Sequence, residues 1–172
     1  MAFFLNLFTA ETWDAFRTHG SSISGFRHRQ RRTAQEDIHA GDIFICYLVG
    51  LSRWCGVLRN TSKAFRDTSP IFDDPDPFVW RFKVEPLAAL DPLHAVPIFD
   101  DRVWTTLSLT KGQEKGARGW AAAYFRASLR RMEDSDGEFL SELLREQANQ
   151  QTPYQFTDRD KRQLGRTRTV RT

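Results

Sequence analysis

The first half of the chain has the hydrophobic pattern of buried β-strands. Residues 43–49 read Ile-Phe-Ile-Cys-Tyr-Leu-Val, an uninterrupted apolar run of strand length. Such a run is typical of a strand that is covered on both faces or enclosed in a barrel. Residues 50–52 then predict a turn, and residues 53–59 predict a second strand that returns beside the first.

A third strand is predicted by regular alternation over residues 78–85. Every second residue is apolar and is expected to point into the core, namely Phe78, Trp80, Phe82 and Val84. The charged residues between them, Arg81, Lys83 and Glu85, are expected to face water. Pro86 is expected to end the strand, because proline cannot donate to the hydrogen-bond ladder of a sheet.

Helical spacing appears before and after these strands. Thr9 is a suitable N-cap for a helix over residues 10–18, and residues 33–39 predict a second, short helix. Residues 120–131 and 136–147 carry apolar side chains three and four positions apart, which predicts two more helices.

The order of these elements predicts an α+β fold. Weaker strand patterns lie at residues 95–99 and 106–109, so residues 3–110 are expected to form a closed or nearly closed mixed β-barrel. A chain of 172 residues has room for one such domain, here residues 1–150. Residues 151–172 have the composition of a basic linker or tail, which would lead to a further domain outside this sequence.

Composition excludes several classes of protein. The mean hydropathy is −0.53, and no apolar run reaches the roughly 18 residues that a membrane span needs. No secretory signal precedes the first strand, which favours the cytoplasm. The two cysteines, Cys46 and Cys55, are too few for a disulfide scaffold and are expected to be small core residues.

Positive charge is concentrated in two segments. The net charge of the chain is only +3, which by itself says little about a partner. Residues 17–32, however, hold five arginines and two histidines without an acid, and residues 159–171 hold six basic residues against one acid. These two segments are therefore the candidate contacts for a polyanion.

A catalytic interpretation finds little support in the sequence. Asp73, Asp74 and Asp76 could hold a divalent cation, as a metal-dependent nuclease requires. A partner acid two residues before Lys83 is missing, because Arg81 stands there. The four histidines are scattered, and no phosphate-binding glycine loop or nucleophile motif is present. We therefore expect neither catalytic residues nor a metal or cofactor, although the nuclease remains an alternative.

The residues favour a binding surface instead. Phe26 is followed directly by a run of cations, so an aromatic face for stacking on a base would stand beside contacts for phosphate. Trp54 lies next to a glycine-bearing turn, where a tryptophan is often found at the rim of a sheet. The alternative for both rings is a place in the core, in which case they contribute packing only.

Two neighbouring segments carry a resemblance to a known family. Residues 40–48 read Ala-Gly-Asp-Ile-Phe-Ile-Cys-Tyr-Leu, and residues 52–58 read Ser-Arg-Trp-Cys-Gly-Val-Leu. A Gly-Asp turn before a strand that ends in tyrosine, and then an aromatic residue before Gly-Val, resembles EVE domains, which are bacterial relatives of YTH and other PUA-like domains. The resemblance extends from Asn6 to about Val96. The region 120–148 looks like an elaboration found in longer members.

The resemblance implies a PUA-like mixed β-barrel surrounded by α-helices, with an aromatic cage at one barrel mouth that receives a flipped base. Carried over by position, the pocket would consist of Trp54, Phe26, Ser22, Ser24, Tyr47, Leu48 and Gly50. The arginines that would hold the nucleic-acid backbone are Arg27, Arg29, Arg31, Arg32 and Arg53. YTH domains place further tryptophans after this strand pair, whereas residues 65–72 offer only phenylalanine.

The resemblance also suggests a biological setting. Bacterial EVE domains are often fused to restriction nucleases or NTPases, so the first hypothesis is a non-catalytic reader of a modified base in DNA that targets a fused or partner effector nuclease. The alternative is an RNA-binding PUA-like module in RNA modification or translation. The sequence does not distinguish ribose from deoxyribose contacts.

Overall fold

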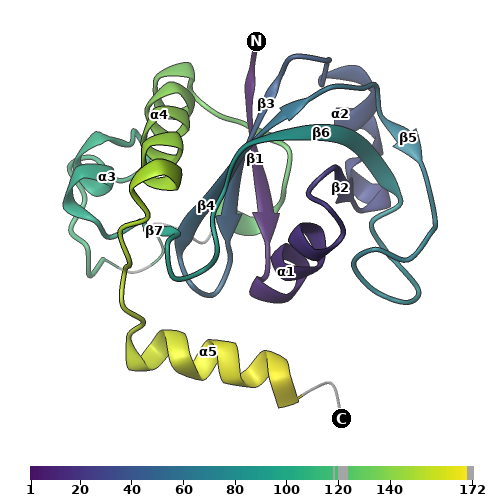
Figure 1. Cartoon of the computed structure of the whole chain (residues 1–172). Coiled ribbons are helices and arrows are strands. Elements are labelled where there is room, and N and C mark those ends of the chain that lie inside the picture. The colour runs from purple at the N-terminus through teal and green to yellow at the C-terminus, as the bar shows by residue number, and fades with distance from the viewer. Residues whose placement is uncertain (118, 120–123, 170–172) are drawn as a thin grey trace.

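The computed structural model describes residues 1–117, 119 and 124–169 and has a curled sheet at its centre (Figure 1). In spatial order the sheet consists of β2 (Ile23–Phe26), β6 (Trp80–Ala89), β4 (Arg53–Asn60), β3 (Ile43–Leu48), β1 (Phe3–Phe8) and β8 (Arg130–Arg131). Two short strands lie off this path: β5 (Phe65–Arg66) pairs with β6, and β7 (Val96–Pro97) pairs with β4. Only β1 and β3 run parallel among these pairs. The result is an open half-barrel.

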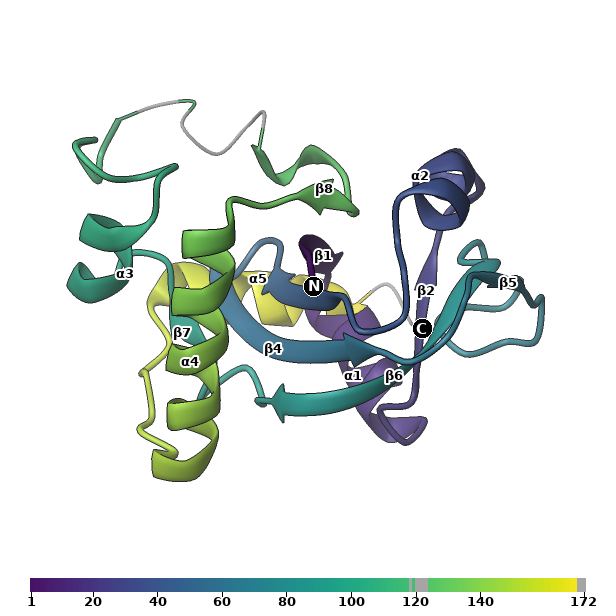
Figure 2. The same ribbon diagram turned by 90° about the horizontal axis from the view of Figure 1, so that it is seen from above.

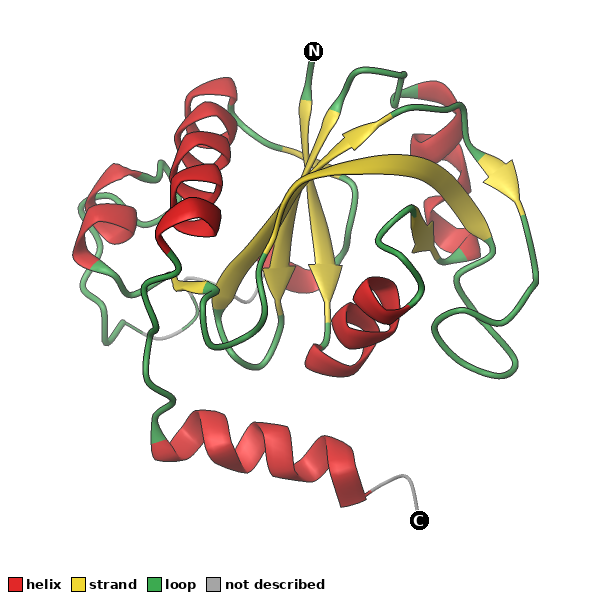
Figure 3. Cartoon of the chain, viewed as in Figure 1, coloured by secondary structure: helices red, strands yellow, loops and turns green. Residues whose placement is uncertain are grey.

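Helices cover both faces of this sheet (Figures 2 and 3). On one face lie α1 (Ala10–Thr18), the 3₁₀ turn η1 (His28–Gln30) and α2 (Arg31–Glu36). The other face is covered by α3 (Asp101–Thr106), the 3₁₀ turn η2 (Tyr124–Arg126) and α4 (Asp134–Gln150). A last helix, α5 (Asp158–Thr169), crosses below the end of the sheet at which β1 finishes. The α+β class that the sequence predicts is confirmed.

Strand β3 separates two hydrophobic cores. Phe44, Cys46 and Leu48 pack with α1 inside the curl of the sheet. Ile45 and Tyr47 point the other way and pack with α4. Every residue of β3 is buried, which confirms the prediction of a strand covered on both faces.

A buried hydrogen bond joins the two sides of the curl. The side-chain amide of Asn6 on β1 donates to Ser24 Oγ on β2 over 2.8 Å, and both residues are at most 1% exposed. Three strands separate β1 from β2 in the sheet, so this bond forms only because the sheet bends round. Register shifts at Cys46/Tyr47 and at Val57/Leu58 supply bends of this kind, because a bulge kinks its strand.

Strand β6 agrees with the alternating pattern but differs from the prediction at two positions. Trp80, Phe82 and Val84 are buried, as expected, and Lys83 is exposed. Arg81 is fully buried instead of facing water, because Asp67 and Asp76 each pair with its guanidinium group. Pro86 does not end the strand, which continues to Ala89. It stands at the register shift between β4 and β6, where a missing N–H is tolerated.

The helix predictions have mixed outcomes. Residues 10–18 form α1 with Thr9 as its N-cap, and residues 136–147 lie within α4. The short helix expected at 33–39 is α2, which begins and ends earlier. The helix expected at 120–131 is wrong over 124–131, where η2 is followed by β8, because β8 completes the edge of the sheet beside β1. Residues 120–123 lie outside the described residues.

Two other segments differ from expectation. Residue 106 ends α3 and residues 107–109 turn away from it, so no strand forms there, whereas the pattern at 95–99 does contain β7. Part of the basic tail, expected to be a linker, forms α5. The helix follows a segment that packs on the barrel, and its buried Asp160 accepts a hydrogen bond from Arg53. The domain boundary near residue 150 stays a prediction.

Cys46 and Cys55 are free thiols in the inner core. Burial raises the pKa of both thiols well above the ordinary value, so both stay protonated and act as small apolar groups. This confirms the role that the sequence predicts for them. Among the described residues, no helix is both long and apolar enough to span a membrane.

Two glycines in helices provide a test of the packing between α4 and β1. A Cβ atom at Gly137 would overlap the ring and Cβ of Phe3, whereas a Cβ at Gly165 in α5 meets nothing within 4 Å. We expect Gly137→Ala to destabilise the fold by about 1–3 kcal/mol, although alanine favours helix. Gly165→Ala should be neutral or slightly stabilising. Thermal melting of both variants checks this, and equal melting temperatures would contradict the packing described.

Candidate nucleic-acid interface

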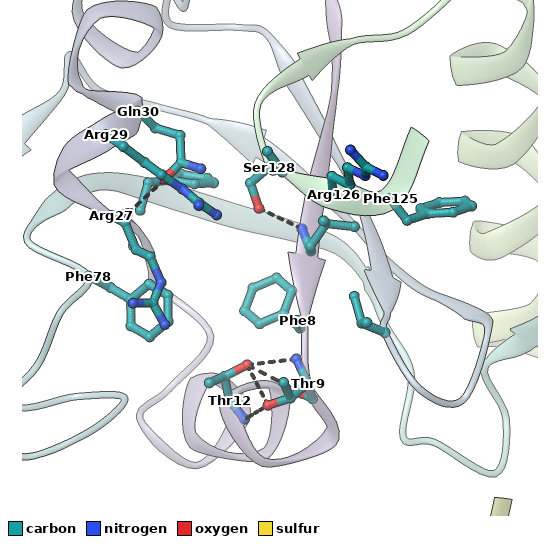
Figure 4. Close-up of a pocket in the computed structure, with 15 residues that line it drawn as sticks. Phe8, Thr9, Thr12, Arg27, Arg29, Gln30, Phe78, Phe125, Arg126 and Ser128 are labelled. Carbon is teal, nitrogen blue, oxygen red and sulfur yellow. Dashed lines mark hydrogen bonds between the residues drawn. The ribbon is translucent and has the colours of Figure 1, made fainter. Parts of the chain in front are cut away.

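A cavity of about 240 Å³ opens at the end of the half-barrel where β1 and β2 both finish (Figure 4). Its wall is built from four segments that are distant in the sequence. They are the end of β1 with the start of α1, the end of β2 with η1, the turn residue Val49, and the segment from Phe125 to Ser128. Phe78 completes the wall. The curl of the sheet therefore creates the cavity, because it brings β1 and β2 together.

Four phenylalanines give the cavity an apolar lining. Phe8 and Phe26 are almost fully buried and form its floor, while Phe78 and Phe125 are half-buried. The Phe26 ring packs against Phe44 and Phe82, with centroids 5.6 and 5.8 Å away. Since little of Phe26 reaches solvent, Phe78 is the ring with surface left to cover a ligand, whereas the Phe125 ring stacks on Tyr47 and points toward α4 (Figure 4).

Phe78 is held in place by a glycine and a carboxylate. A Cβ atom at Gly25 would come within 2.9 Å of Phe78 Cβ and 2.8 Å of Phe72 Cε2, so only glycine permits this close approach. The Asp76 carboxylate accepts a hydrogen bond of 2.7 Å from the backbone N–H of Phe78. The guanidinium group of Arg27 lies over the Phe78 ring, 5.0 Å from its centroid. These contacts hold the Phe78 ring in a fixed position in the cavity wall.

The carboxylate of Asp76 is fully used in an ion pair and in hydrogen bonds within the loop before β6. The second carboxylate oxygen of Asp76 accepts hydrogen bonds from the backbone N–H groups of Ile71 and Phe72. It also forms an ion pair with Arg81 over 3.2 Å, and the side chains of Asp76 and Arg81 are both fully buried. Asp73 and Asp74 are exposed. Within the described part of the chain, no group of three His, Cys, Asp or Glu residues could hold a metal ion. The geometry thus gives Asp76 a structural role and lends no support to the nuclease alternative.

The polar side of the cavity is cationic. Arg27, Arg29 and Arg126 line it, and none of the described residues around it is acidic. Figure 4 places Arg29 and Arg126 on opposite sides of the opening. Gln30 is nearly buried on the same side as Arg29, and its side-chain oxygen accepts a hydrogen bond from the backbone N–H of Arg27 over 3.0 Å. The amide of Gln30 is thereby fixed at the edge of an apolar space.

Three hydroxyl groups brace the rim. Ser128 Oγ accepts a hydrogen bond of 2.9 Å from the backbone N–H of Leu7, which ties the segment after η2 to β1 (Figure 4). Thr9 and Thr12 bond to each other's backbone N–H groups in a reciprocal cap of α1. These bonds hold the rim in place without a ligand.

The structure separates the two rings that the sequence proposes as cage walls. Phe26 lines the cavity and belongs to the core inside the curl. Trp54 is fully buried in the core on the opposite face of the sheet and does not line the cavity. Neighbouring positions along a strand alternate between faces, so the turn beside Trp54 does not decide which face the ring occupies. The two rings therefore do not form one cage.

Trp54 instead belongs to an aromatic stack that ends at the cavity. Its ring meets Tyr47 edge-on at 4.8 Å, and Tyr47 stacks on Phe125 at 4.0 Å. Within the described structure the indole N–H has no hydrogen-bond partner. Burial raises the pKa of Tyr47 to about 12, while a hydrogen bond with Ser52 and the charge of Arg159 act in the opposite direction. Trp54 and Tyr47 thus support Phe125 from behind.

The remaining predicted pocket residues also lie outside the cavity. Ser22 is exposed at the start of β2, and Ser24 is buried against Asn6. Leu48 is in the inner core. Gly50 has a φ of +90°, which glycine adopts without strain, and it follows Val49 at the rim.

The five predicted phosphate contacts fall into two groups. Arg27 and Arg29 line the cavity, while Arg31 and Arg32 are exposed on α2, each bonded to a side chain one turn later. Arg53 is 2% exposed and does not reach the surface. Its guanidinium group donates to the carbonyl groups of Pro92, Tyr154 and Gln155 and to Asp160. The prediction that Arg53 contacts the nucleic-acid backbone is thus wrong, because the C-terminal segment packs over the Arg53 side chain.

Sequence reasoning missed much of the cavity. Phe8, Gln30, Val49, Phe78, Phe125, Arg126 and Ser128 line it without having been proposed. Phe78 was assigned to the core because it continues the alternation of β6, yet it precedes the strand. Phe125 and Ser128 come from far along the chain and carry no local signal.

The fold resembles that of YTH domains. Mmi1 YTH domain complexed with RNA matches at a TM-score of 0.60 and 13% identity, over 90% of this chain and 84% of that one. The YTH domain of the Zygosaccharomyces rouxii MRB1 protein in complex with N6-methyladenosine RNA matches at 0.55 and 12%, over 84% and 86%. The Pho92 YTH domain in complex with m6A matches at 0.54 and 15%, over 91% and 86%. No family model matches the chain, and no curated protein does. The chain thus has a YTH-like, PUA-like fold.

Because Trp54 is fully buried and Phe78 is half-buried, we expect substitution by alanine to reduce the free energy of unfolding by different amounts. Trp54→Ala removes a fully buried side chain and should destabilise the fold by about 3–5 kcal/mol. Phe78→Ala removes a half-buried ring and should cost roughly half as much, because the loss scales with buried area. Denaturant unfolding of the two variants measures this. If Trp54→Ala unfolded like the parent, Trp54 would not be a core residue.

Proposed function

We propose that this chain is a non-catalytic reader that binds single-stranded RNA and holds one modified base in the cavity at the end of the half-barrel. The observation that carries the proposal is the combination of phenylalanine walls with Arg27, Arg29 and Arg126 around one small space. The fold supports it, because the similar YTH domains include complexes with RNA and with N6-methyladenosine.

The chemistry of the cavity suits a nucleotide. Phe78 offers a face for a base, and stacking of this kind is worth about 1–3 kcal/mol per base. Arginines at the rim suit the phosphates on either side of that base. The fixed amide of Gln30 offers a donor and an acceptor for the edge of the base. A single strand is favoured over a duplex, because flipping a paired base costs a few kcal/mol.

Selectivity for a modified base would come from burial of the added group. One methyl group buried in an apolar space contributes about 0.8 kcal/mol, which is about a fourfold preference. A preference larger than fourfold requires that binding of the unmodified base leave a polar group in the site without a hydrogen-bond partner. Gln30, nearly buried at the edge of the phenylalanine lining, is the residue that we assign to this role.

RNA is the preferred ligand in this proposal, and DNA is the second candidate. The similar solved structures of the Mmi1 and MRB1 YTH domains include complexes with RNA. The assignment to EVE domains, with modified DNA as ligand and a role in targeting a restriction nuclease in the cytoplasm, rests on the two sequence segments 40–48 and 52–58. Binding of matched RNA and DNA strands distinguishes the two ligands.

Phe78→Ala tests the proposed site. The variant should lose about tenfold or more in affinity for a single-stranded RNA that carries one N6-methyladenosine, because the stacking face is removed. It should also lose the preference over the same RNA with adenine. Fluorescence anisotropy measures both quantities, with Phe139→Ala as the matched control, since Phe139 is a half-buried ring on α4 away from the cavity.

The proposal predicts parent-like binding for the Phe139→Ala control. A folded Phe78→Ala variant that keeps full affinity and full preference would remove the cavity as the base site. A parent protein that binds the DNA strand and not the RNA strand would replace RNA with DNA as the ligand.

A further inference from the structure

The helix α5 has a strongly basic outer surface. Arg159, Lys161, Arg162 and Arg166 are all exposed, and Asp158 is the only exposed acid among the described side chains of the helix. In the described part of the chain none of these four cations has an ion-pair partner. Arg162 and Arg166 are one turn apart, and like charges at that spacing destabilise an isolated helix. The helix therefore exposes charge that nothing within the described chain compensates.

Buried contacts nevertheless fix α5 to the barrel. The buried carboxylate of Asp160 lies 3.3 Å from Arg53 Nη2 and also accepts from the backbone N–H of Thr157 over 3.0 Å. The ring of Phe156 stacks on the Arg53 guanidinium group, 4.8 Å from its centroid. Leu164 packs against the inner core from further along the helix. The position of the basic surface is thus set by packing.

A contact with the turn after β3 places α5 beside the cavity. Gln163 lies next to Gly50, in the turn whose preceding residue, Val49, lines the cavity. Figure 1 shows α5 crossing below the end of the sheet at which β1 and α1 meet.

We propose that the basic surface of α5, formed by Arg159, Lys161, Arg162 and Arg166, binds the phosphates of the strand whose base occupies the cavity. This inference rests on the proposed function and adds a second contact region to it. Arg29 and Arg126 hold the phosphates next to the bound base, and α5 holds nucleotides further along the strand. Affinity for a longer strand therefore depends on α5, whereas choice of the base depends on the cavity.

The double variant Arg162→Glu/Arg166→Glu tests this surface. Both side chains are exposed and lie outside the cavity, so the fold and the base site stay intact. We expect about a tenfold or larger loss of affinity for an RNA about twelve nucleotides long, with the loss greatest at low salt. The slope of log K against log salt should fall by about 0.7 per lost contact, hence about 1.4 for two. Binding of the nucleoside N6-methyladenosine alone should be unchanged.

A charge-matched control separates α5 from net charge. Lys111→Glu/Arg145→Glu makes the same change in charge at exposed positions after α3 and on α4, and it should bind the longer RNA almost like the parent. Equal losses in the two double variants would overturn the role of α5. Parent-like RNA binding by Arg162→Glu/Arg166→Glu would also overturn the role of α5. If Phe78→Ala still lost the base preference in that case, the proposed function would stand without α5. A parent that binds neither RNA nor the nucleoside would instead overturn the proposed function itself.

Discussion

The site depends on the bending of one sheet until its two sides meet. The hydrogen bond between Asn6 and Ser24 marks that contact, since it links strands that are separated by three others in the sheet. Both side chains are buried, so loss of either partner would leave a polar group without a hydrogen bond, at a cost of about 1–3 kcal/mol. Because β1 and β2 end side by side just beyond this bond, Phe8 and Phe26 become the floor of one cavity.

A second constraint sets the shape of the cavity. The loop before β6 folds over β2 because Gly25 has no side chain and because Asp76 gathers three backbone N–H groups and the buried Arg81. That arrangement brings Phe78 to the rim, where Arg27 covers it. In the sequence, Asp76 looks like a metal ligand and Arg81 looks like part of a solvated strand face. In the structure, both residues instead position the ring of Phe78 at the rim of the cavity.

The strands of the fold were predictable, whereas most of the site was not. Long apolar runs and alternation identify β3, β4 and β6, because burial of a sheet face imposes those periods. Arg81 and Arg53 escaped prediction because the acids that pair with them, Asp76 and Asp160, come from loops and a distant helix. Trp54 escaped it because a tryptophan beside a turn fits either face of a sheet. Arg27 and Arg29 were accessible to sequence reasoning, since they directly follow the strand that ends at the cavity.

The central claim is that a single base enters the space between β1 and β2. The most direct measurement is a titration of the ¹⁵N-labelled protein with N6-methyladenosine, followed by two-dimensional NMR. The account predicts saturable shifts of the backbone amides of Phe8, Gly25, Arg27 and Ser128, which lie around the cavity, with small shifts in α3 and α4. Shifts confined to α3 and α4, or none at concentrations that saturate RNA binding, would contradict it.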